Sequence, residues 1–126
     1  DKTWTEEPLP PGFGDARFTS VAFAGREAIA VSDAGVLVDD GGGWKADPGL
    51  QDLLGTLGPD AGAQLTIAAG LADGGAVIGG RDIVVERDRA GSAWRFADQP
   101  LPGQTVVAAA ALRAGARVRA IVASRK

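Results

Sequence analysis

The sequence predicts an all-β fold built from consecutive four-stranded antiparallel meanders. Short apolar runs rich in Val and Ile alternate with turns rich in Gly and Asp, as in residues 28–44. A weaker copy of this pattern follows at residues 76–94, and both copies end on a tryptophan. Runs this short, separated by glycine-containing turns, are typical of strands joined by hairpins.

The first part of the chain is expected to supply one strand, a loop and then a complete meander. Residues 1–17 place a strand at Trp4 and then three prolines within four positions, which excludes a helix or a central strand there. The β-branched and aromatic content of the next segments predicts strands. These are expected at 18–24, 27–31 and 36–38, with a glycine-rich bend at 39–43 that leads into Trp44.

The segment 47–64 interrupts the strand pattern. Its leucines at positions 50, 53, 54 and 57 have helical spacing, which is compatible with one or two helical turns. Gly55 and the short length of the segment favour an ordered loop instead.

A second meander and the beginning of a third are predicted after this loop. The second is expected to have strands at 65–69, 76–78, 83–86 and 94–96, with turns at 72–75 and 79–82. The alanine-rich run at 106–112 has helical propensity, but its place at the start of a new unit predicts a strand. A turn near Gly115 then leads to a strand at 119–122.

The spacing of the tryptophans indicates a repeat. Trp4, Trp44 and Trp94 recur after 40 and then 50 residues, and a Pro/Leu segment follows each of them. Repeats of this length with four strands each are typical of β-propeller blades. The expected division is the last strand of a preceding blade in 1–17, blades at 18–64 and 65–105, and two strands of a further blade at 106–126.

This division supplies two and a half to three blades, whereas a closed propeller needs about four or more. The ring is therefore expected to be incomplete in this chain. We expect the remaining blades to come from another polypeptide segment or from another copy of the chain, with a fragment of a longer propeller favoured.

Residues 30–44 carry a resemblance to known propellers. They resemble blades of the photosystem II assembly-factor propellers and of the wider bacterial neuraminidase repeat, or Asp-box, group. Asp39, Gly41 and Trp44 match the aspartate, glycine and aromatic positions of the box, although Leu37 replaces its usual Ser or Thr. In the second copy Gly91 and Trp94 match. The resemblance implies that Asp39 caps a turn, and it favours an extracytoplasmic or secreted bacterial setting.

Composition excludes several classes of chemistry. The chain has no His, Cys, Tyr or Met, so cysteine nucleophiles, Ser-His triads and thiolate or imidazole metal sites are impossible within it. The 16 acidic and 13 basic residues are scattered, which argues against nucleic acid as a partner. No apolar run approaches the roughly 20 residues of a membrane span. The aspartate segments also lack the alternating ligands of a calcium loop, so neither a cofactor nor a metal is expected.

One loop face gathers the candidate ligand-binding residues. If each blade is a meander, the turns between second and third strands share a face with the connections between blades. The candidates on this face are Asp15, Arg17, Asp33, Arg81, Asp82 and Arg125. Such Arg and Asp groups are able to bind a sugar, a peptide or a cation, but turn capping and solvation explain them more simply.

These patterns predict a non-enzymatic scaffold or binding module that contacts another protein. A glycan-binding, lectin-like or glycosidase-related propeller is the alternative. Sialidase chemistry, implied by the Asp-box resemblance, uses a tyrosine nucleophile that this chain lacks. The tryptophans recur at one position of the repeat and are expected in the core, which leaves Phe13 and Phe96 as aromatic candidates for a glycan.

Overall fold

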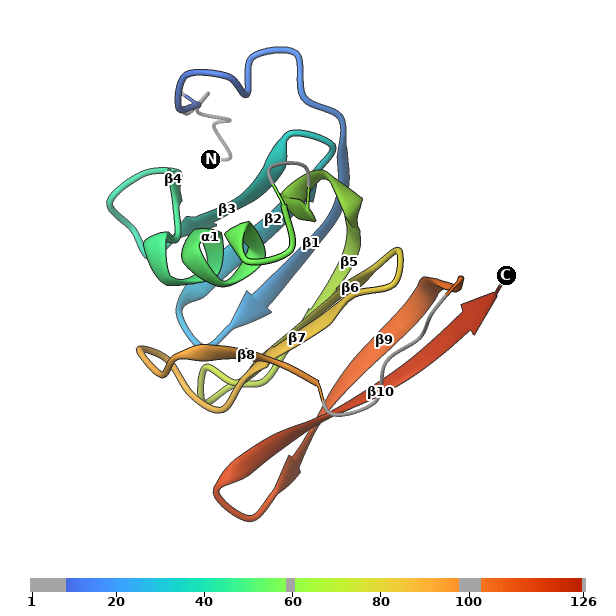
Figure 1. Cartoon of the computed structure of the whole chain (residues 1–126). Coiled ribbons are helices and arrows are strands. Elements are labelled where there is room, and N and C mark those ends of the chain that lie inside the picture. The colour runs from blue at the N-terminus through green and yellow to red at the C-terminus, as the bar shows by residue number, and fades with distance from the viewer. Residues whose placement is uncertain (1–8, 59–60, 98–102, 126) are drawn as a thin grey trace, which may run out of the picture.

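The computed structural model describes residues 9–58, 61–97 and 103–125, and it is mostly antiparallel β-structure (Figure 1). The strands are β1 (Phe18–Ala24), β2 (Glu27–Ser32), β3 (Gly35–Asp39), β4 (Lys45–Ala46), β5 (Leu65–Gly70), β6 (Ala76–Gly80), β7 (Val84–Arg87), β8 (Trp94–Phe96), β9 (Thr105–Ala114) and β10 (Arg117–Arg125). The helix α1 (Pro48–Gly55) and the 3₁₀ turn η1 (Ala61–Gln64) lie between β4 and β5.

The strands form three sheets in chain order. The first sheet has the order β1-β2-β3-β4, the second has β5-β6-β7-β8, and the third is the hairpin of β9 and β10. All neighbouring strands are antiparallel, and within the described residues no sheet closes on itself. The predicted all-β class, with consecutive four-stranded antiparallel sheets, is therefore confirmed.

Each sheet carries a break in register near the start of its first strand. The break lies between Phe18 and Ser20 in β1 and between Leu65 and Ile67 in β5. In the third sheet it lies opposite Val107, between Ala123 and Ser124 of β10. Thr19, Thr66 and Val107 are thus the extra residues of three β-bulges. The three sheets can be aligned residue by residue on these bulges.

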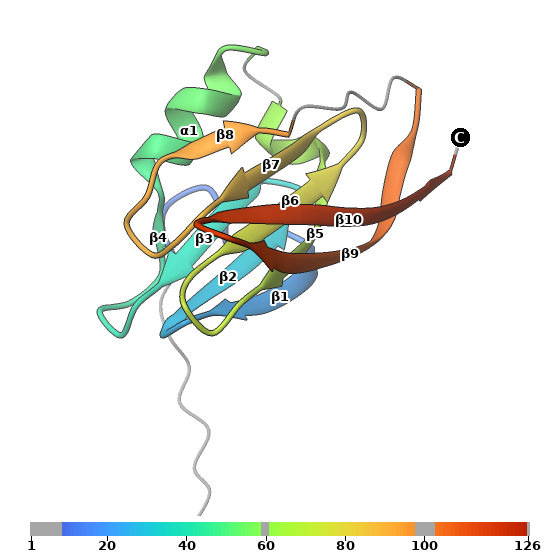
Figure 2. The same cartoon turned by 90° about the horizontal axis from the view of Figure 1, so that it is seen from below.

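The sheets stack side by side, and their first strands approach one another most closely. β1 lies beside β5, and β5 lies beside β9 (Figures 1 and 2). The Thr19 hydroxyl donates to the Thr66 carbonyl oxygen at 2.8 Å, and the Thr66 hydroxyl donates to the Val106 carbonyl oxygen at 3.3 Å. A Cβ on Gly70 would lie 2.2 Å from the Phe23 carbonyl oxygen, so a side chain there would separate the sheets.

Helix α1 is the main difference from the sequence prediction, which favoured an ordered loop. The Asp47 carboxylate caps it by accepting from the Leu50 N–H at 3.2 Å, and Pro48 occupies its first turn. Leu50 and Leu54 are buried in the core between the first and second sheets. Gly55 is the last residue of the helix, so it does not interrupt the helical hydrogen bonds. Tertiary packing stabilises a helix that would be marginal in isolation.

Other elements agree with the predicted segments to within a few residues. The alanine-rich run is part of strand β9, as its place in the repeat predicted. The predicted turn at 79–82 is shorter, because β6 continues through Gly80. Trp94 is buried in the core, but Trp44 is only half-buried and precedes β4. Trp4 lies outside the described residues, so its strand stays a prediction.

Candidate interaction surfaces

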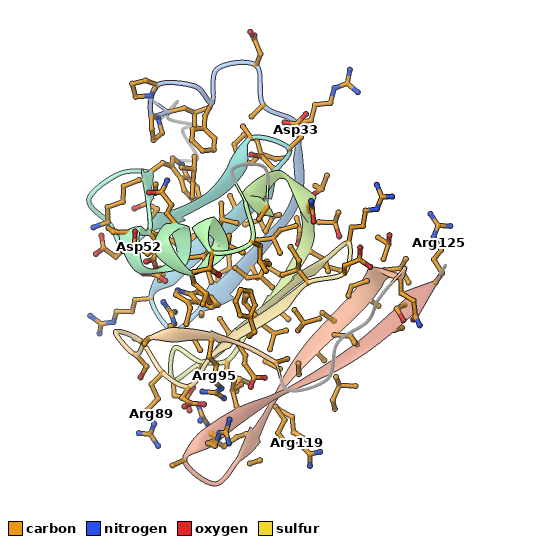
Figure 3. The ribbon with its side chains drawn as sticks, in the orientation of Figure 1. Asp33, Asp52, Arg89, Arg95, Arg119 and Arg125 are labelled. Atoms are coloured by element: carbon orange, nitrogen blue, oxygen red, sulfur yellow. The ribbon has the colours of Figure 1, made fainter. Side chains whose placement is uncertain are left out.

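The predicted loop face is a row of exposed residues at one end of the three sheets. Asp15 and Arg17 precede β1, while Asp33 and the pair Arg81–Asp82 occupy the β2–β3 and β6–β7 turns. Alignment on the bulges places Asp33, Arg81 and Arg125 at one equivalent position. Figure 3 shows Asp33 and Arg125 on the same side of the molecule, both pointing outward.

Two aspartates of this face, Asp33 and Asp82, bond the backbone of the segments that precede β1 and β9. Asp33 accepts from the Arg17 backbone N–H at 2.9 Å, and its own N–H donates to the Arg17 carbonyl oxygen at 3.0 Å. Asp82 has a positive φ of 64° and accepts from the Gly103 N–H. Across the described ranges no ion pair joins the arginines and aspartates of this face, nor do three or more acidic side chains gather as metal ligands. The face therefore offers separate charges rather than a converging site.

The glycine-rich bend after β3 is also held by a carboxylate. Asp39 accepts from the Gly41 N–H at 2.7 Å and from the Gly43 N–H at 3.2 Å. Both glycines have positive φ, which favours glycine at these positions. Asp39 therefore stabilises the turn by accepting hydrogen bonds from its backbone N–H groups, as in an Asx turn.

A buried arginine joins the first and second sheets. Arg87 is 3% exposed, and its Nε and Nη2 donate to the Gly74 carbonyl oxygen at 3.1 and 2.9 Å. Its Nη1 lies 2.9 Å from Glu27 Oε1, and its guanidinium stacks 4.9 Å from the centre of the Trp94 ring. The indole N–H donates to Asp47 at 3.0 Å. Every polar group in this cluster serves the packing of the sheets.

A second polar cluster joins the second and third sheets. Asp88 receives two hydrogen bonds from Arg95, at 2.7 and 2.8 Å, and one from the Val118 N–H at 2.8 Å. These donors lower the pKa of Asp88 to about 2, and the same pairing raises the pKa of Arg95. The Gly75 N–H, with Arg113, lowers the pKa of Asp73.

Sequence reasoning missed both clusters. The alternating charges at 86–89 were the available signal, but the partners of these residues lie on other sheets.

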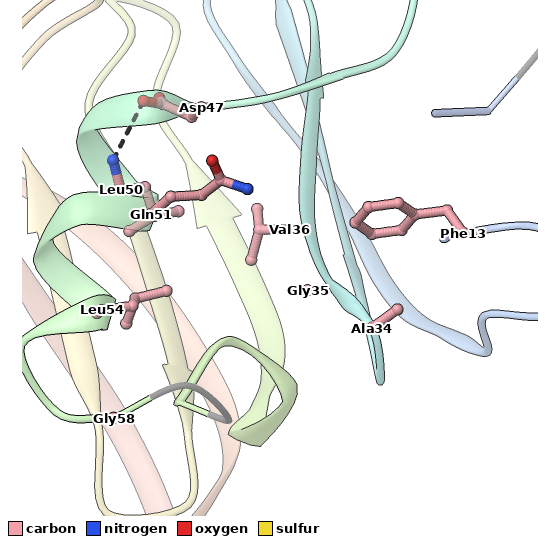
Figure 4. A pocket seen from close by; sticks show the side chains of 10 residues that line it. Phe13, Ala34, Gly35, Val36, Asp47, Leu50, Gln51, Leu54 and Gly58 are labelled. Atoms are coloured by element: carbon pink, nitrogen blue, oxygen red, sulfur yellow. Dashed lines mark hydrogen bonds between the residues drawn. The ribbon is translucent and has the colours of Figure 1, made fainter. Parts of the chain in front are cut away.

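A pocket of about 250 Å³ lies between α1 and the β2–β3 turn (Figure 4). Its lining is formed by Phe13, Ala34, Gly35, Val36, Asp47, Leu50, Gln51, Leu54, Gly55 and Gly58. The Asp47 carboxylate is already used by the helix cap and by Trp94. What remains is a small, mainly apolar hollow with the Gln51 amide at its edge. It can hold an apolar side chain, but it presents no reactive group.

The outward-facing surfaces of the first and third sheets are the most prominent apolar surfaces. We call them the rear face (Phe18, Val21 and Phe23 on β1) and the front face (Ala108, Ala110 and Leu112 on β9, with Ile121 and Ala123 on β10). Phe23 is 70% exposed and Ile121 is 55% exposed. Exposed apolar patches of this kind mark interaction sites or aggregation-prone surfaces.

Comparison with protein-family models, curated proteins and solved structures finds no match to this chain. Of the helices in the described residues, none has the length and apolar character needed to cross a membrane.

Proposed function

We propose that this chain is a non-enzymatic β-propeller scaffold whose sheets are consecutive blades and whose front and rear faces bind protein. One observation carries the proposal. When the three sheets are aligned on their bulges, the exposed residues of the two faces occupy certain positions in their own sheet. The equivalent positions of the other sheets are buried where one sheet packs on the next.

The front face supports this in detail. Ile121 aligns with Ile29 of the first sheet and with Val77 of the second, and both of these side chains are fully buried. Ile29 belongs to the core between the first and second sheets, and Val77 belongs to the cluster between the second and third. Ile121 occupies the same position on the third sheet, where it is 55% exposed among the described residues.

The residues of the rear face occupy positions that the other sheets bury against the preceding sheet rather than the following one. Phe18 aligns with Leu65 and Val106, which are buried against the preceding sheet, and Phe18 itself is 40% exposed. The half-buried Trp44 aligns with the buried Trp94, since Lys45 and Arg95 pair with equivalent residues of β3 and β7. A sheet seated on the rear face would bury these side chains as the internal interfaces do.

The described polar residues favour a scaffold over an enzyme or a lectin. Asp33 and Asp82 of the loop face bond the backbone of neighbouring connections, the buried Arg87 pairs with Glu27 of the first sheet, and Asp88 accepts from the Val118 N–H of the third sheet. Protein-binding surfaces need only complementary apolar area with a polar rim. The resemblance of residues 30–44 to assembly-factor propellers agrees with this function.

The native mass of the species that contains this chain tests the proposal. We expect a mass above the 12.7 kDa of a single chain, from a second polypeptide or from further copies. Phe23→Asp and Ile121→Asp should each weaken that assembly. Leu57→Asp is a matched control, because Leu57 is equally exposed, at 55%, but lies in the loop after α1. A single-chain native mass would overturn the proposal.

A further inference from the structure

We infer that the front face binds an acidic partner protein, which places a carboxylate against Arg119 at the border of the apolar residues. This inference rests on the proposed scaffold function and names the chemistry of one partner. Three observations carry it: the charge of the third sheet, the arrangement of the side chains around its front face, and the charge at the equivalent place of an internal interface.

The segment that forms the third sheet is basic throughout. Residues 103–126 hold four arginines and one lysine and no acidic residue. Residues 1–102 hold eight basic and 16 acidic residues and so carry a net charge of −8. The basic residues are scattered over the sequence as a whole, but this segment collects five of them with no acid among them. A surface of one sign attracts partners of the opposite sign.

Only one of these arginines is used between the sheets. Arg113 faces the second sheet and forms an ion pair with Asp73. The side chains of Arg117, Arg119 and Arg125 are exposed, and no hydrogen bond or ion pair joins them to another group in the described part of the chain. Figure 3 shows Arg119 and Arg125 projecting outward from the third sheet. Their charges are therefore available to a partner.

Arginines border the front face on the same side of the sheet. Side chains alternate along β10, so that those toward the second sheet are buried or half-buried and the others are exposed. The exposed column of β10 is Arg117, Arg119, Ile121, Ala123 and Arg125. Opposite its first four members, β9 contributes three alanines and Leu112, which is 49% exposed. An apolar centre within a polar rim is the usual plan of a protein-binding surface, and here the rim is cationic.

An internal interface shows what the position of Arg119 requires. Alignment on the bulges gives Arg119 the position that Glu27 holds on the first sheet. There Glu27 Oε1 lies 2.9 Å from Nη1 of Arg87 on the second sheet, and the Glu27 side chain is only 21% exposed. A sheet that packs on this position therefore meets its charge with the opposite charge. Because the sign is reversed on the third sheet, the partner should supply a carboxylate.

The small size of the side chains favours a protein over a membrane as the partner. Apart from Ile121 and Leu112, the front face consists of alanines, and none of its residues is aromatic. Segments that lie in a membrane interface typically insert Trp, Phe and Leu side chains. A flat surface of small residues instead allows another protein to pack closely against it.

NMR spectra of the ¹⁵N-labelled chain test the inference with three synthetic octapeptides. Each peptide alternates valine with a second residue, which is glutamate, glutamine or lysine. The glutamate peptide should shift amide resonances of β9 and β10. It should bind at least about tenfold more tightly than the glutamine peptide, because it adds charge pairing to the apolar contact. The lysine peptide should not bind.

Reversal of the charge at Arg119 is the decisive variant. Arg119→Glu should weaken binding of the glutamate peptide by about tenfold or more and should create binding of the lysine peptide. Arg26→Glu is the matched control, because Arg26 is equally exposed but lies in the β1–β2 turn of the first sheet. It should leave the preference for glutamate unchanged. Circular dichroism and urea unfolding check that both variants fold.

Three results would overturn the inference. Equal affinity for the glutamate and glutamine peptides would mean that the face recognises apolar surface alone. Shifts confined to other strands, or no shifts at millimolar glutamate peptide, would mean that the arginines serve only to solvate the sheet. Sedimentation with phosphatidylserine vesicles but not with phosphatidylcholine vesicles, lost in Arg119→Glu, would assign the face to an anionic membrane instead.

The outcome is separable from that of the scaffold function. If the peptides show no preference for acid while the native species holds a second polypeptide, the scaffold function stands and only the acidic partner is overturned. A native species of one chain would overturn the scaffold function itself, whatever the peptides show.

Discussion

Arg87 shows how a single side chain couples two sheets. It extends from β7 to the Gly74 carbonyl oxygen and to Glu27 on β2, and its guanidinium covers the Trp94 ring. Arg87→Ala should lower the free energy of unfolding by about 3–5 kcal/mol, because it leaves a buried carbonyl and a partly buried carboxylate without their donor. Urea unfolding measures this.

Two further variants sharpen the Arg87 prediction. Glu27→Gln should cost less, since Glu27 is 21% exposed and water can replace its partner. Arg89→Ala, at the exposed arginine two residues along, should stay within about 0.5 kcal/mol of wild type. An Arg87→Ala cost as small as the Arg89→Ala cost would contradict the coupling.

Asp88 makes the contact between the second and third sheets dependent on pH. Its pKa is lowered from 3.8 to about 2, because its ionised form accepts hydrogen bonds from Arg95 and Val118. Stability from this group is therefore fully present above about pH 4 and is lost as the pH falls through 2. Asp88→Asn should be less stable at neutral pH and should lose less stability between pH 4 and pH 2.

Urea midpoints at several pH values measure the Asp88 effect. Asp52→Asn, at an exposed position of α1, is the control. Parallel pH profiles for wild type and Asp88→Asn would show that another group governs the acid transition.

The residue scale also shows where sequence reasoning succeeds. Aspartates beside glycines in short connections predict turn caps, because the hydrogen bonds are local, and Asp39 does accept from the Gly41 N–H of its own turn. Asp33 instead accepts from the Arg17 N–H, 16 residues away. The Arg87 cluster was not foreseeable in this way. Arg87 lies 60 residues from Glu27, and Trp94 lies 47 residues from Asp47, so only the stacking of the sheets brings these pairs together.

At the scale of elements, the strands were predictable and the helix was not. Period-two apolar patterns with glycine turns identify strands from local sequence alone. Helix α1 depends on burying Leu50 and Leu54 beside Trp94, a contact between elements that no local pattern reports. The positions of the bulges were equally hidden, since they are defined by pairing between strands.

The close approach of β1 and β5 gives a prediction about elements. Gly70→Ala should destabilise the chain by about 1–3 kcal/mol or more, because its Cβ would lie 2.2 Å from the Phe23 carbonyl oxygen. Gly55→Ala is the matched control: nothing lies within 4 Å of its added Cβ, and alanine favours the helix. Thermal unfolding of both variants tests this, and a neutral Gly70→Ala would mean that the two strands can separate without cost.

At the scale of the whole molecule, stability should be distributed unevenly along the stack. The second sheet is covered on both sides, and β6 is buried throughout. In the third sheet half-buried and exposed residues alternate along most of β9 and β10, since only one face meets another described sheet. Local opening costs least where few apolar contacts are broken. In a monomer, the hairpin of the third sheet should therefore open before the second sheet does.

Hydrogen–deuterium exchange measures this order of opening. In monomeric Ile121→Asp, amides of β9 and β10 should exchange faster than those of β6 and β7. In the wild-type native assembly, protection should increase in β10 and β1, the strands of the front and rear faces, while β6 stays unchanged. Because association stabilises only the strands that it buries, this pattern reports where partners bind. Protection that rises equally in all three sheets would instead indicate a general stabilisation, with no preferred face.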